Sequence, residues 1–180
     1  MNDVIGKIRS AQRIAIAGWP GSGKSTFAKR LGEKLGRKVW SIDKINFDKN
    51  GREVQESEFN EAHEKLLLRK AWIIEGNAMG RSIDKRLSVA DIILFFDSNR
   101  FIAAKNCLLR IFKTKIGLEK RQGVLAPLGN AFKQTRHIFM VSPKSMAVIR
   151  DLLMGYKDKT YYVKSRREIN KMMKDLQEIK

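Results

Sequence analysis

The feature that most constrains this chain is an eight-residue phosphate-binding pattern near its start. Residues 18–25 read G-W-P-G-S-G-K-S, which matches G-x-x-x-x-G-K-S without a break. The apolar run at 13–17 predicts a buried strand before the pattern, and residues 25–35 after it carry apolar side chains at helical spacing. A chance glycine-rich turn lacks this strand–loop–helix context, so we expect a nucleoside triphosphate to bind here.

The residue types of the pattern fit that ligand. Gly21 and Gly23 let backbone N–H groups close around phosphates, and the start of the following helix adds partial positive charge. Lys24 can reach the β- and γ-phosphates, and Ser25 can offer its hydroxyl to Mg²⁺. The expected cofactors are therefore ATP and Mg²⁺. The expected cofactor-binding residues of the loop are Gly18, Gly21, Ser22, Gly23, Lys24, Ser25 and Thr26.

Length and composition predict a single domain over residues 1–180. The chain is 43% hydrophobic, which is enough to build a substantial core. It contains no run of about 18 apolar residues that would span a membrane. Residues 1–7 lack the apolar core of a secretory signal, and one cysteine excludes an intrachain disulfide. We expect a cytoplasmic protein that does not insert into membranes.

Net charge is the second unusual property, at +18. Residues 1–97 contain 18 Lys and Arg against 13 Asp and Glu, whereas residues 98–180 contain 19 against 6. Residues 98–150 alone hold 11 basic side chains and one acidic side chain. Such a block suggests contact with an anionic partner. A basic lid over nucleotide phosphates, a nucleic-acid surface, and solvated lysines without a specific partner are the three interpretations.

Alternating apolar runs and helical periodicity predict an α/β fold. Predicted strands cover 13–17, 38–42, 71–74, 91–96 and 160–164. Predicted helices cover 25–35, 57–70, 99–113, 131–156 and 167–179, with an irregular segment at 114–130. Strands that are separated by helices favour a parallel sheet covered on both faces.

Ligands of such sheets gather at the carboxyl ends of the strands, so the acidic residues there are candidates. Asp43 follows the second strand and could accept a proton from an attacking hydroxyl or orient the acceptor. Glu75 follows the third strand and could hold Mg²⁺, directly or through water. Turn or capping roles are the alternatives for both residues. We expect Asp97, after the fourth strand, to cap the next helix.

With these residues in view, the chain resembles the adenylate-kinase-like P-loop kinases, and among them the bacterial DNA topology modulation kinases of the FlaR type. The sharpest pointer to this subgroup is W-I-I-E-G-N at 72–77. The matching segments are 18–25, 41–45, 72–77, 84–87, 90–97 and 165–168. Their order covers about residues 13–113 and 158–178, which is most of the chain.

The resemblance implies a three-layer P-loop NTPase fold with a five-stranded parallel sheet of order 2-3-1-4-5. It also implies an acceptor-side helical region at about 44–70 and a helical lid at about 110–135. Arg81 and Arg86 would bind the acceptor phosphate, although Arg86 could instead pair with a helix acid. Arg166 would contact the adenine.

The chain departs from the subgroup's pattern at several positions. Glu75 stands where the subgroup usually has Asp, and Ala78 stands where an aromatic residue follows the Gly-Asn pair. Asn106 occupies a position where the pattern has an arginine that faces the transferred phosphate. Arg110, one turn later, is the remaining candidate for stabilising charge in the transition state.

These observations predict an ATP-dependent phosphotransferase that acts on a small hydroxyl- or phosphate-bearing acceptor, for which a nucleotide is one candidate. The expected catalytic residues are Lys24, Asp43, Glu75 and Arg110, and the expected metal ligands are Ser25 and Glu75. One alternative is a nucleotide-dependent nucleic-acid-binding protein that uses the basic 98–150 region; it is not favoured. A second alternative is a nucleotide-binding regulator with little turnover.

Overall fold

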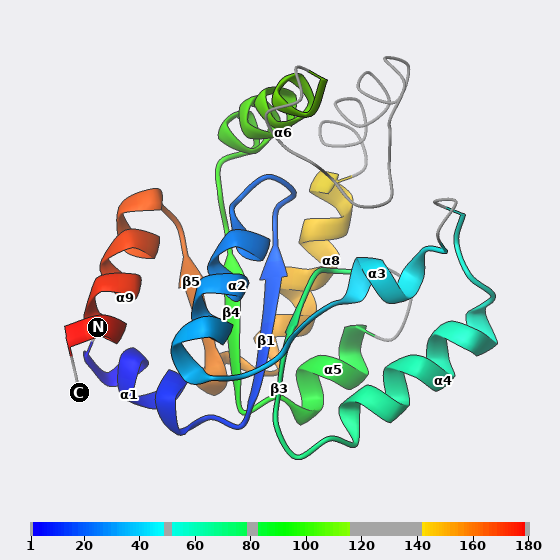
Figure 1. Cartoon of the computed structure of the whole chain (residues 1–180), viewed down its shortest axis with the longest axis horizontal. Coiled ribbons are helices and arrows are strands. Elements are labelled where there is room, and N and C mark those ends of the chain that lie inside the picture. Colours follow the sequence, from blue (N-terminus) through cyan, green and yellow to red (C-terminus); the bar gives the residue numbers. More distant parts are fainter. Residues whose placement is uncertain (1, 49–51, 79–82, 116–141, 179–180) are drawn as a thin grey trace.

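Five short parallel strands form the centre of the molecule, in the spatial order β2-β3-β1-β4-β5 (Figure 1). The computed structural model describes residues 2–48, 52–78, 83–115 and 142–178. The strands are β1 (Arg13–Gly18), β2 (Val39–Ser41), β3 (Trp72–Glu75), β4 (Ile92–Phe96) and β5 (Thr160–Val163). All five predicted strands and the predicted order are confirmed.

The helices of the described residues are α1 (Asn2–Ser10), α2 (Lys24–Leu35), α3 (Ile42–Asn46), α4 (Glu56–Leu67), α5 (Ile83–Val89), α6 (Arg100–Lys115), α8 (Ser142–Met154), the 3₁₀ turn η1 (Lys157–Lys159) and α9 (Arg166–Glu178). The sequence analysis missed α1, α3 and α5. Of the predicted helix 131–156, residues 131–141 lie outside the described residues, as does most of the irregular segment 114–130. None of the described helices is long and apolar enough to cross a bilayer.

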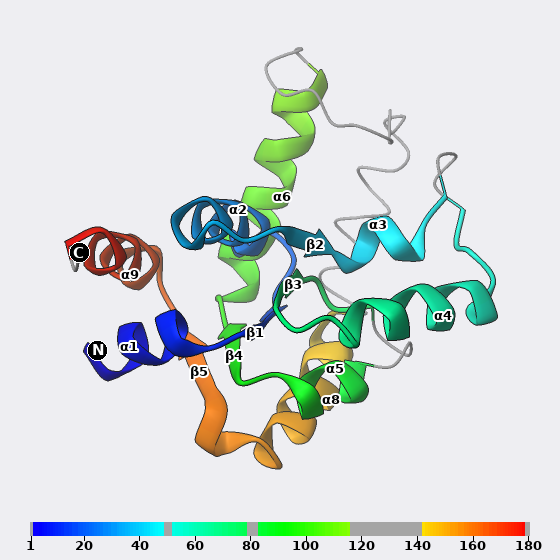
Figure 2. The ribbon, with the colours of Figure 1, turned by 60° about the horizontal axis from the view of Figure 1, so that its bottom comes forward.

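Helices cover both faces of the sheet because the strands are apolar on both sides. Along β1, Ile14 and Ile16 contribute to one buried cluster, whereas Ala15 and Ala17 contribute to the other. The first cluster is completed by α1, α2 and α9, and the second by α4, α5 and α8, which lie on opposite sides of the sheet (Figure 2). This is the three-layer arrangement that the sequence predicted.

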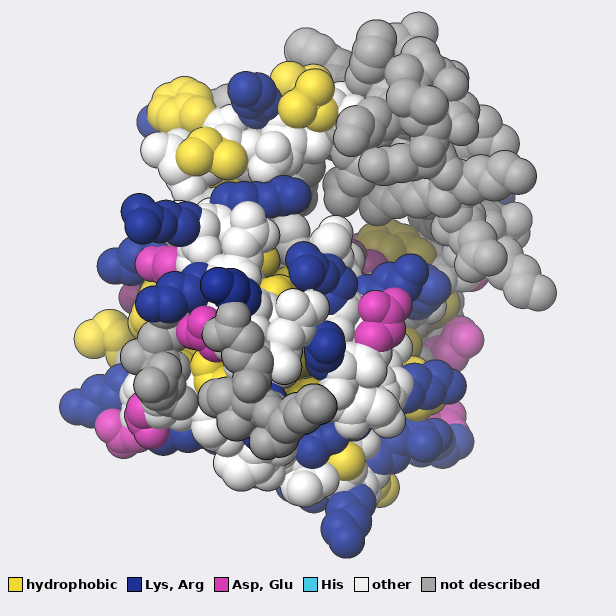
Figure 3. Space-filling model, turned by 60° about the vertical axis from the view of Figure 1, so that its left-hand side comes forward, with side chains coloured by type: hydrophobic (Ala, Val, Ile, Leu, Met, Phe, Trp, Pro, Cys, Tyr) yellow, Lys and Arg dark blue, Asp and Glu magenta, His cyan; other side chains and the backbone are white. Residues whose placement is uncertain are grey.

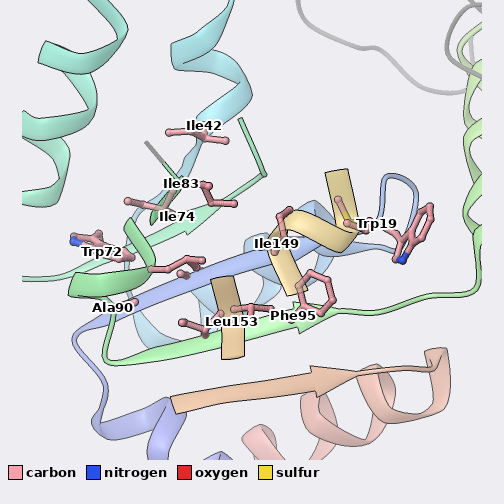
Figure 4. Close-up of a cluster of buried hydrophobic side chains, with 14 of the residues drawn as sticks. Trp19, Ile42, Trp72, Ile74, Ile83, Ala90, Phe95, Ile149 and Leu153 are labelled. Carbon is pink, nitrogen blue, oxygen red and sulfur yellow. The ribbon is translucent and has the colours of Figure 1, made fainter. Parts of the chain in front are cut away.

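The register of the strands brings their carboxyl ends to one edge. Ser41 of β2 pairs with Glu75 of β3, and Gly18 of β1 pairs with Phe96 of β4. The loop after β1 begins at this edge, and α6 rises beyond it (Figure 1). Trp19, the first residue of that loop, is 5% exposed and belongs to the same cluster as Phe95 and Ile149 (Figure 4). The core therefore extends directly into the loop.

The close approach of β1 to β4 at Gly18 gives a test of this architecture. Gly18 has φ +131°, and a Cβ atom added to it would lie 2.3 Å from the carbonyl oxygen of Phe96. We expect Gly18→Ala to cost roughly 3 kcal/mol or more, because the positive φ and the backbone clash both oppose a side chain. Thermal unfolding should show a fall in Tm of about 6–12 °C.

Gly6→Ala is the matched control, since a Cβ atom on Gly6 of α1 would meet nothing within 4 Å. Alanine is the better helix former, so this variant should gain about 0.5–1 kcal/mol. Equal stability of the Gly18 and Gly6 variants would show that the contact with Phe96 does not constrain the fold.

Candidate active site

The loop between β1 and α2 has the backbone conformation that phosphate binding requires. Gly21 and Gly23 adopt positive φ values of 73° and 95°, which residues with a side chain rarely take. The helix α2 begins at Lys24, and Gly23 at its N-cap supplies no side-chain hydrogen bond. The first N–H groups of α2 therefore face the loop, where an anion can be bound.

Lys24 is the cation of this loop and is 9% exposed. Its Nζ donates to the carbonyl oxygen of Gly18 at 2.9 Å and to that of Trp19 at 2.6 Å. The hydroxyl of Ser22 is also buried and has no hydrogen-bond partner among the described residues. Thr26 lies exposed in the first turn of α2. The ammonium group of Lys24 is thus held by backbone carbonyls of the loop itself.

Ser25 and Glu75, the two predicted metal ligands, lie together. The hydroxyl of Ser25 donates to Oε2 of Glu75 at 3.0 Å, although the two residues are 50 positions apart in sequence. Glu75 is buried at the end of β3. A hydroxyl and a carboxylate are hard oxygen donors, and Mg²⁺ usually takes one or two carboxylates together with phosphate oxygens. This donor set therefore fits Mg²⁺.

Asp43 lies in the first turn of α3 and is exposed at the same edge. Its carboxylate faces Gly76, where a Cβ atom would come 3.4 Å from Oδ1. Gly76 itself has φ +113°, so the chain turns sharply after Glu75. Asp43 and Glu75 thus lie on either side of this turn, one open to solvent and the other buried.

Arg86 lies beneath the turn that follows β3. The resemblance made it an acceptor ligand, but its side chain is fully buried on α5. Nη2 donates to the carbonyl oxygens of Gly76 and Asn77, each at 3.0 Å. Contact between Arg86 and an acceptor therefore stays a prediction. The guanidinium is enclosed within the fold, and Asp43 of α3 is among its negatively charged neighbours. The guanidinium holds the turn after β3.

Burial lowers the pKa of Arg86 to about 10, and the negative charges of Asp43 and Glu75 oppose that effect. At neutral pH the side chain is still a cation. Arg86, Asp43 and Glu75 therefore form a cluster of one buried cation and two carboxylates at this edge of the sheet. Removal of this buried cation would leave both carboxylates without their shared positive neighbour.

Two asparagines contact the phosphate-binding loop, and the sequence analysis assigned neither of them a role. Asn77 accepts from the N–H of Gly18 at 3.0 Å and donates to the carbonyl oxygen of Gly18 at 2.9 Å. Asn106 of α6 donates to the carbonyl oxygen of Gly21 at 3.0 Å. The W-I-I-E-G-N segment was the one signal for Asn77.

Asp97 does not cap α6, which corrects the expectation from the sequence. Asn99 takes that place, since its Oδ1 accepts from the N–H of Phe101 at 2.8 Å. Oδ1 of Asp97 instead accepts from Nε1 of Trp19 at 3.3 Å and from Nη2 of Arg150 at 2.5 Å. Arg150 lies on α8, so this aspartate joins α8 to the phosphate-binding loop.

Arg166 begins α9 and is exposed at the carboxyl end of β5. The helix start is fixed by Glu168, which accepts from the N–H of Lys164 and whose own N–H donates to Ser165 Oγ at 3.2 Å. One turn later, Ile169 lies 3.9 Å from the place where a Cβ atom of Gly23 would be. The start of α9 is therefore next to the loop.

The other predicted cations cannot be placed in the same way. Arg81 lies outside the described residues, and so do most of the predicted lid at 110–135 and the side chain of Arg110. On the face that Figure 3 brings forward, Lys and Arg side chains are widespread and acidic side chains are fewer and scattered among them. Within the described residues, no group of three or more His, Cys, Asp or Glu forms a metal cluster.

No protein-family model matches the chain, and no curated protein does. Among solved structures, a shikimate kinase from Acinetobacter baumannii in complex with shikimate matches with a TM-score of 0.57 and 18% sequence identity, covering 98% of this chain and 99% of that one. The shikimate kinase from Bacteroides thetaiotaomicron matches with a TM-score of 0.53 and 16% identity, covering 94% and 98%. A gluconokinase from Sinorhizobium meliloti has a TM-score of 0.49 and 16% identity, covering 91% and 88%.

At this sequence identity, the likeness to the two shikimate kinases shows the fold. The chain has the shikimate-kinase-like P-loop NTPase fold over nearly its whole length. This confirms the predicted fold class.

Near the site, His63 of α4 gives a test of electrostatics. It is 0% exposed, and neither ring nitrogen has a hydrogen-bond partner among the described residues. Burial, together with the positive charges of Arg86 and Lys85, lowers the pKa of His63 to about 4, although Glu64 and Asp84 oppose the shift. The unfolded chain therefore takes up this proton first, near pH 6.5, as the pH falls.

Folding stability should consequently decline between pH 6.5 and pH 4 by on the order of 2 kcal/mol through His63. His63→Phe keeps the ring that packs on Phe59 but removes the titration. Urea unfolding at pH 7.5 and pH 4.5 should show a smaller loss for the variant than for the native chain. Identical losses in the two proteins would mean that His63 is not held neutral in the fold.

Proposed function

We propose that this protein is an ATP- and Mg²⁺-dependent kinase of the nucleoside-monophosphate-kinase-like group. It would transfer the γ-phosphate of ATP to a small hydroxyl- or phosphate-bearing acceptor. The observation that carries the proposal is the 3.0 Å hydrogen bond between Ser25 of α2 and Glu75 of β3, beside a loop that has left-handed glycines and is followed by a buried lysine. The W-I-I-E-G-N segment supports a place in the FlaR-type subgroup.

The proposed roles follow from position. Backbone N–H groups at 21–25 would cradle the phosphates, and Lys24 would neutralise charge between the β- and γ-phosphates. Ser25 and Glu75 would hold Mg²⁺, which neutralises phosphate charge when it is bound. Arg166 would contact the adenine from the start of α9. Arg110 and Arg81 remain predicted contacts of the transferred phosphate and of the acceptor.

Asp43 is the proposed base. It is exposed at the edge that the phosphate-binding loop shares, so an acceptor hydroxyl can reach its carboxylate. In the transfer, the acceptor oxygen forms a bond to the γ-phosphorus while the bond from that phosphorus to the β–γ bridging oxygen breaks. ADP leaves with the bridging oxygen, and the hydroxyl proton passes to Asp43.

The nucleic-acid alternative rests on net charge alone. Much of the basic 98–150 block lies outside the described residues, and a basic balance by itself is weak evidence. The names of the structural neighbours give small-molecule kinases. Phosphotransfer to a small acceptor is therefore the function that the site supports best.

The proposal predicts transfer of radiolabelled phosphate from ATP to at least one member of a panel that contains nucleoside monophosphates, shikimate and gluconate. Lys24→Ala should abolish this turnover and weaken ATP binding about 10- to 100-fold, because charge-assisted contacts to phosphate are lost. Calorimetry measures the affinity. Lys29→Ala on the exposed side of α2 is the matched control and should behave like the native chain. Unchanged ATP affinity in the Lys24 variant would remove the proposal.

Separate variants distinguish the two strand-end carboxylates. Asp43→Asn should slow transfer by about 10²–10⁴-fold with nearly native ATP affinity, since a positioned base is lost. Glu75→Gln should instead raise the Mg²⁺ concentration that half-maximal activity needs. Asp3→Asn on α1 controls for the loss of a carboxylate elsewhere. Equal and mild effects at positions 43 and 75 would favour turn roles for both residues.

A further inference from the structure

We propose that Arg86 is a positioning residue that sets the geometry of the phosphate-binding loop through Asn77. The inference rests on the proposed function, because it gives the loop's geometry a catalytic purpose. Its first link is the pair of 3.0 Å hydrogen bonds from Nη2 of Arg86 to the carbonyl oxygens of Gly76 and Asn77. These carbonyls belong to the turn that follows β3, which includes Ala78 at φ +43°.

The second link runs from Asn77 to the end of β1. The side-chain amide of Asn77 pairs with both the N–H and the carbonyl oxygen of Gly18, at 3.0 and 2.9 Å. One step earlier, the N–H of Gly76 bonds the carbonyl oxygen of Ile16 at 3.0 Å, as in a regular parallel ladder. The Asn77 amide thus adds one more rung to the sheet, with a side chain in the place of backbone.

The third link reaches the lysine. The carbonyl oxygen of Gly18 that accepts from Asn77 also accepts from Nζ of Lys24 at 2.9 Å. On the opposite side, the N–H of Trp19 bonds the carbonyl oxygen of Phe96 at 3.0 Å. A displacement of Asn77 therefore moves the Gly18 carbonyl to which Nζ of Lys24 donates. The hydrogen bond from Trp19 to β4 meanwhile holds the next residue in place.

Arginine suits the start of this chain of contacts. Its planar guanidinium can hold two neighbouring carbonyls from one nitrogen in a fixed orientation, which a flexible ammonium does not reproduce. Nη1 has no hydrogen-bond partner in the part of the chain that the structure describes. The two contacts from Nη2 are thus the described hydrogen bonds that orient the guanidinium, with Asp43 and Glu75 as its charged neighbours.

The test compares Arg86→Lys, Asn77→Ala and the double variant. Arg9→Lys is the matched control, because Arg9 also donates from Nη2 to a backbone carbonyl, that of Leu176 at 3.0 Å, between α1 and α9. Two quantities are measured on fully folded protein: ATP affinity with Mg²⁺ by calorimetry, and the ¹⁹F resonance of 5-fluorotryptophan at Trp19. The chain has three tryptophans, so Trp19→Phe assigns that resonance.

Each single variant should bind ATP about five- to tenfold more weakly and should shift the Trp19 resonance. The double variant should bind ATP with about the same affinity as the single variant that binds ATP less tightly, since both changes break the same chain of contacts. Arg9→Lys should change Tm alone. Losses that multiply in the double variant, or variants at 86 and 77 that change only Tm, would overturn the proposal.

Three further outcomes are distinguished by this design. Should Arg86→Lys fail to fold, Asn77→Ala decides alone. Native ATP affinity and an unmoved Trp19 resonance in Asn77→Ala would show that this chain of contacts does not set the geometry of the loop. If the native chain binds ATP but transfers phosphate to no acceptor, the proposed function fails while the binding measurements still test the role of Arg86. If it does not bind ATP, the Trp19 resonance decides: a shift in the variants at 86 and 77 supports the path, and an unmoved resonance overturns it.

Discussion

The architecture of the site depends on a steric constraint at Gly18, where β1 ends and the phosphate-binding loop begins. The main chain there passes so close to β4 that a Cβ atom would lie 2.3 Å from the carbonyl oxygen of Phe96. Only a residue without a side chain lets the loop leave the sheet at this angle while Trp19 still bonds the same carbonyl. Lys24 and Ser25 begin the helix at the other end of this loop, so their positions depend on how the loop leaves β1.

Around Gly18, polar side chains hydrogen-bond the loop and fix it to the sheet and the helices. Asn77 holds Gly18 from the β3 side, Asn106 holds Gly21 from α6, and Asp97 holds the indole of Trp19 from β4. A loop that is already fixed loses less conformational freedom when a ligand binds, so more of the contact energy appears as affinity. The buried guanidinium of Arg86 belongs to this arrangement, although it lies behind the loop.

The strands and the loop could be predicted because their signals are local. Ile92–Phe96 is an uninterrupted apolar run, and the glycines of 18–25 have a fixed spacing. The support of the site could not be predicted so fully. The Asn77–Gly18 pairing joins residues 59 positions apart, and nothing in the local sequence I-D-K-R-L indicates that Arg86 is buried beneath the turn after β3. At seven residues, α5 is also too short for a clear helical period.

The proximity of α9 to the phosphate-binding loop has a consequence for biosynthesis. Ile169 lies against Gly23, and α9 packs with α1 and α2 on one face of the sheet. The loop is therefore synthesised well before α9, the helix that packs beside it. Until β5 and α9 emerge, the nascent loop borders on open solvent along that side, and β4 has an unpaired edge. Enclosure of the loop on this side thus coincides with late folding of the sheet, rather than with synthesis of the loop itself.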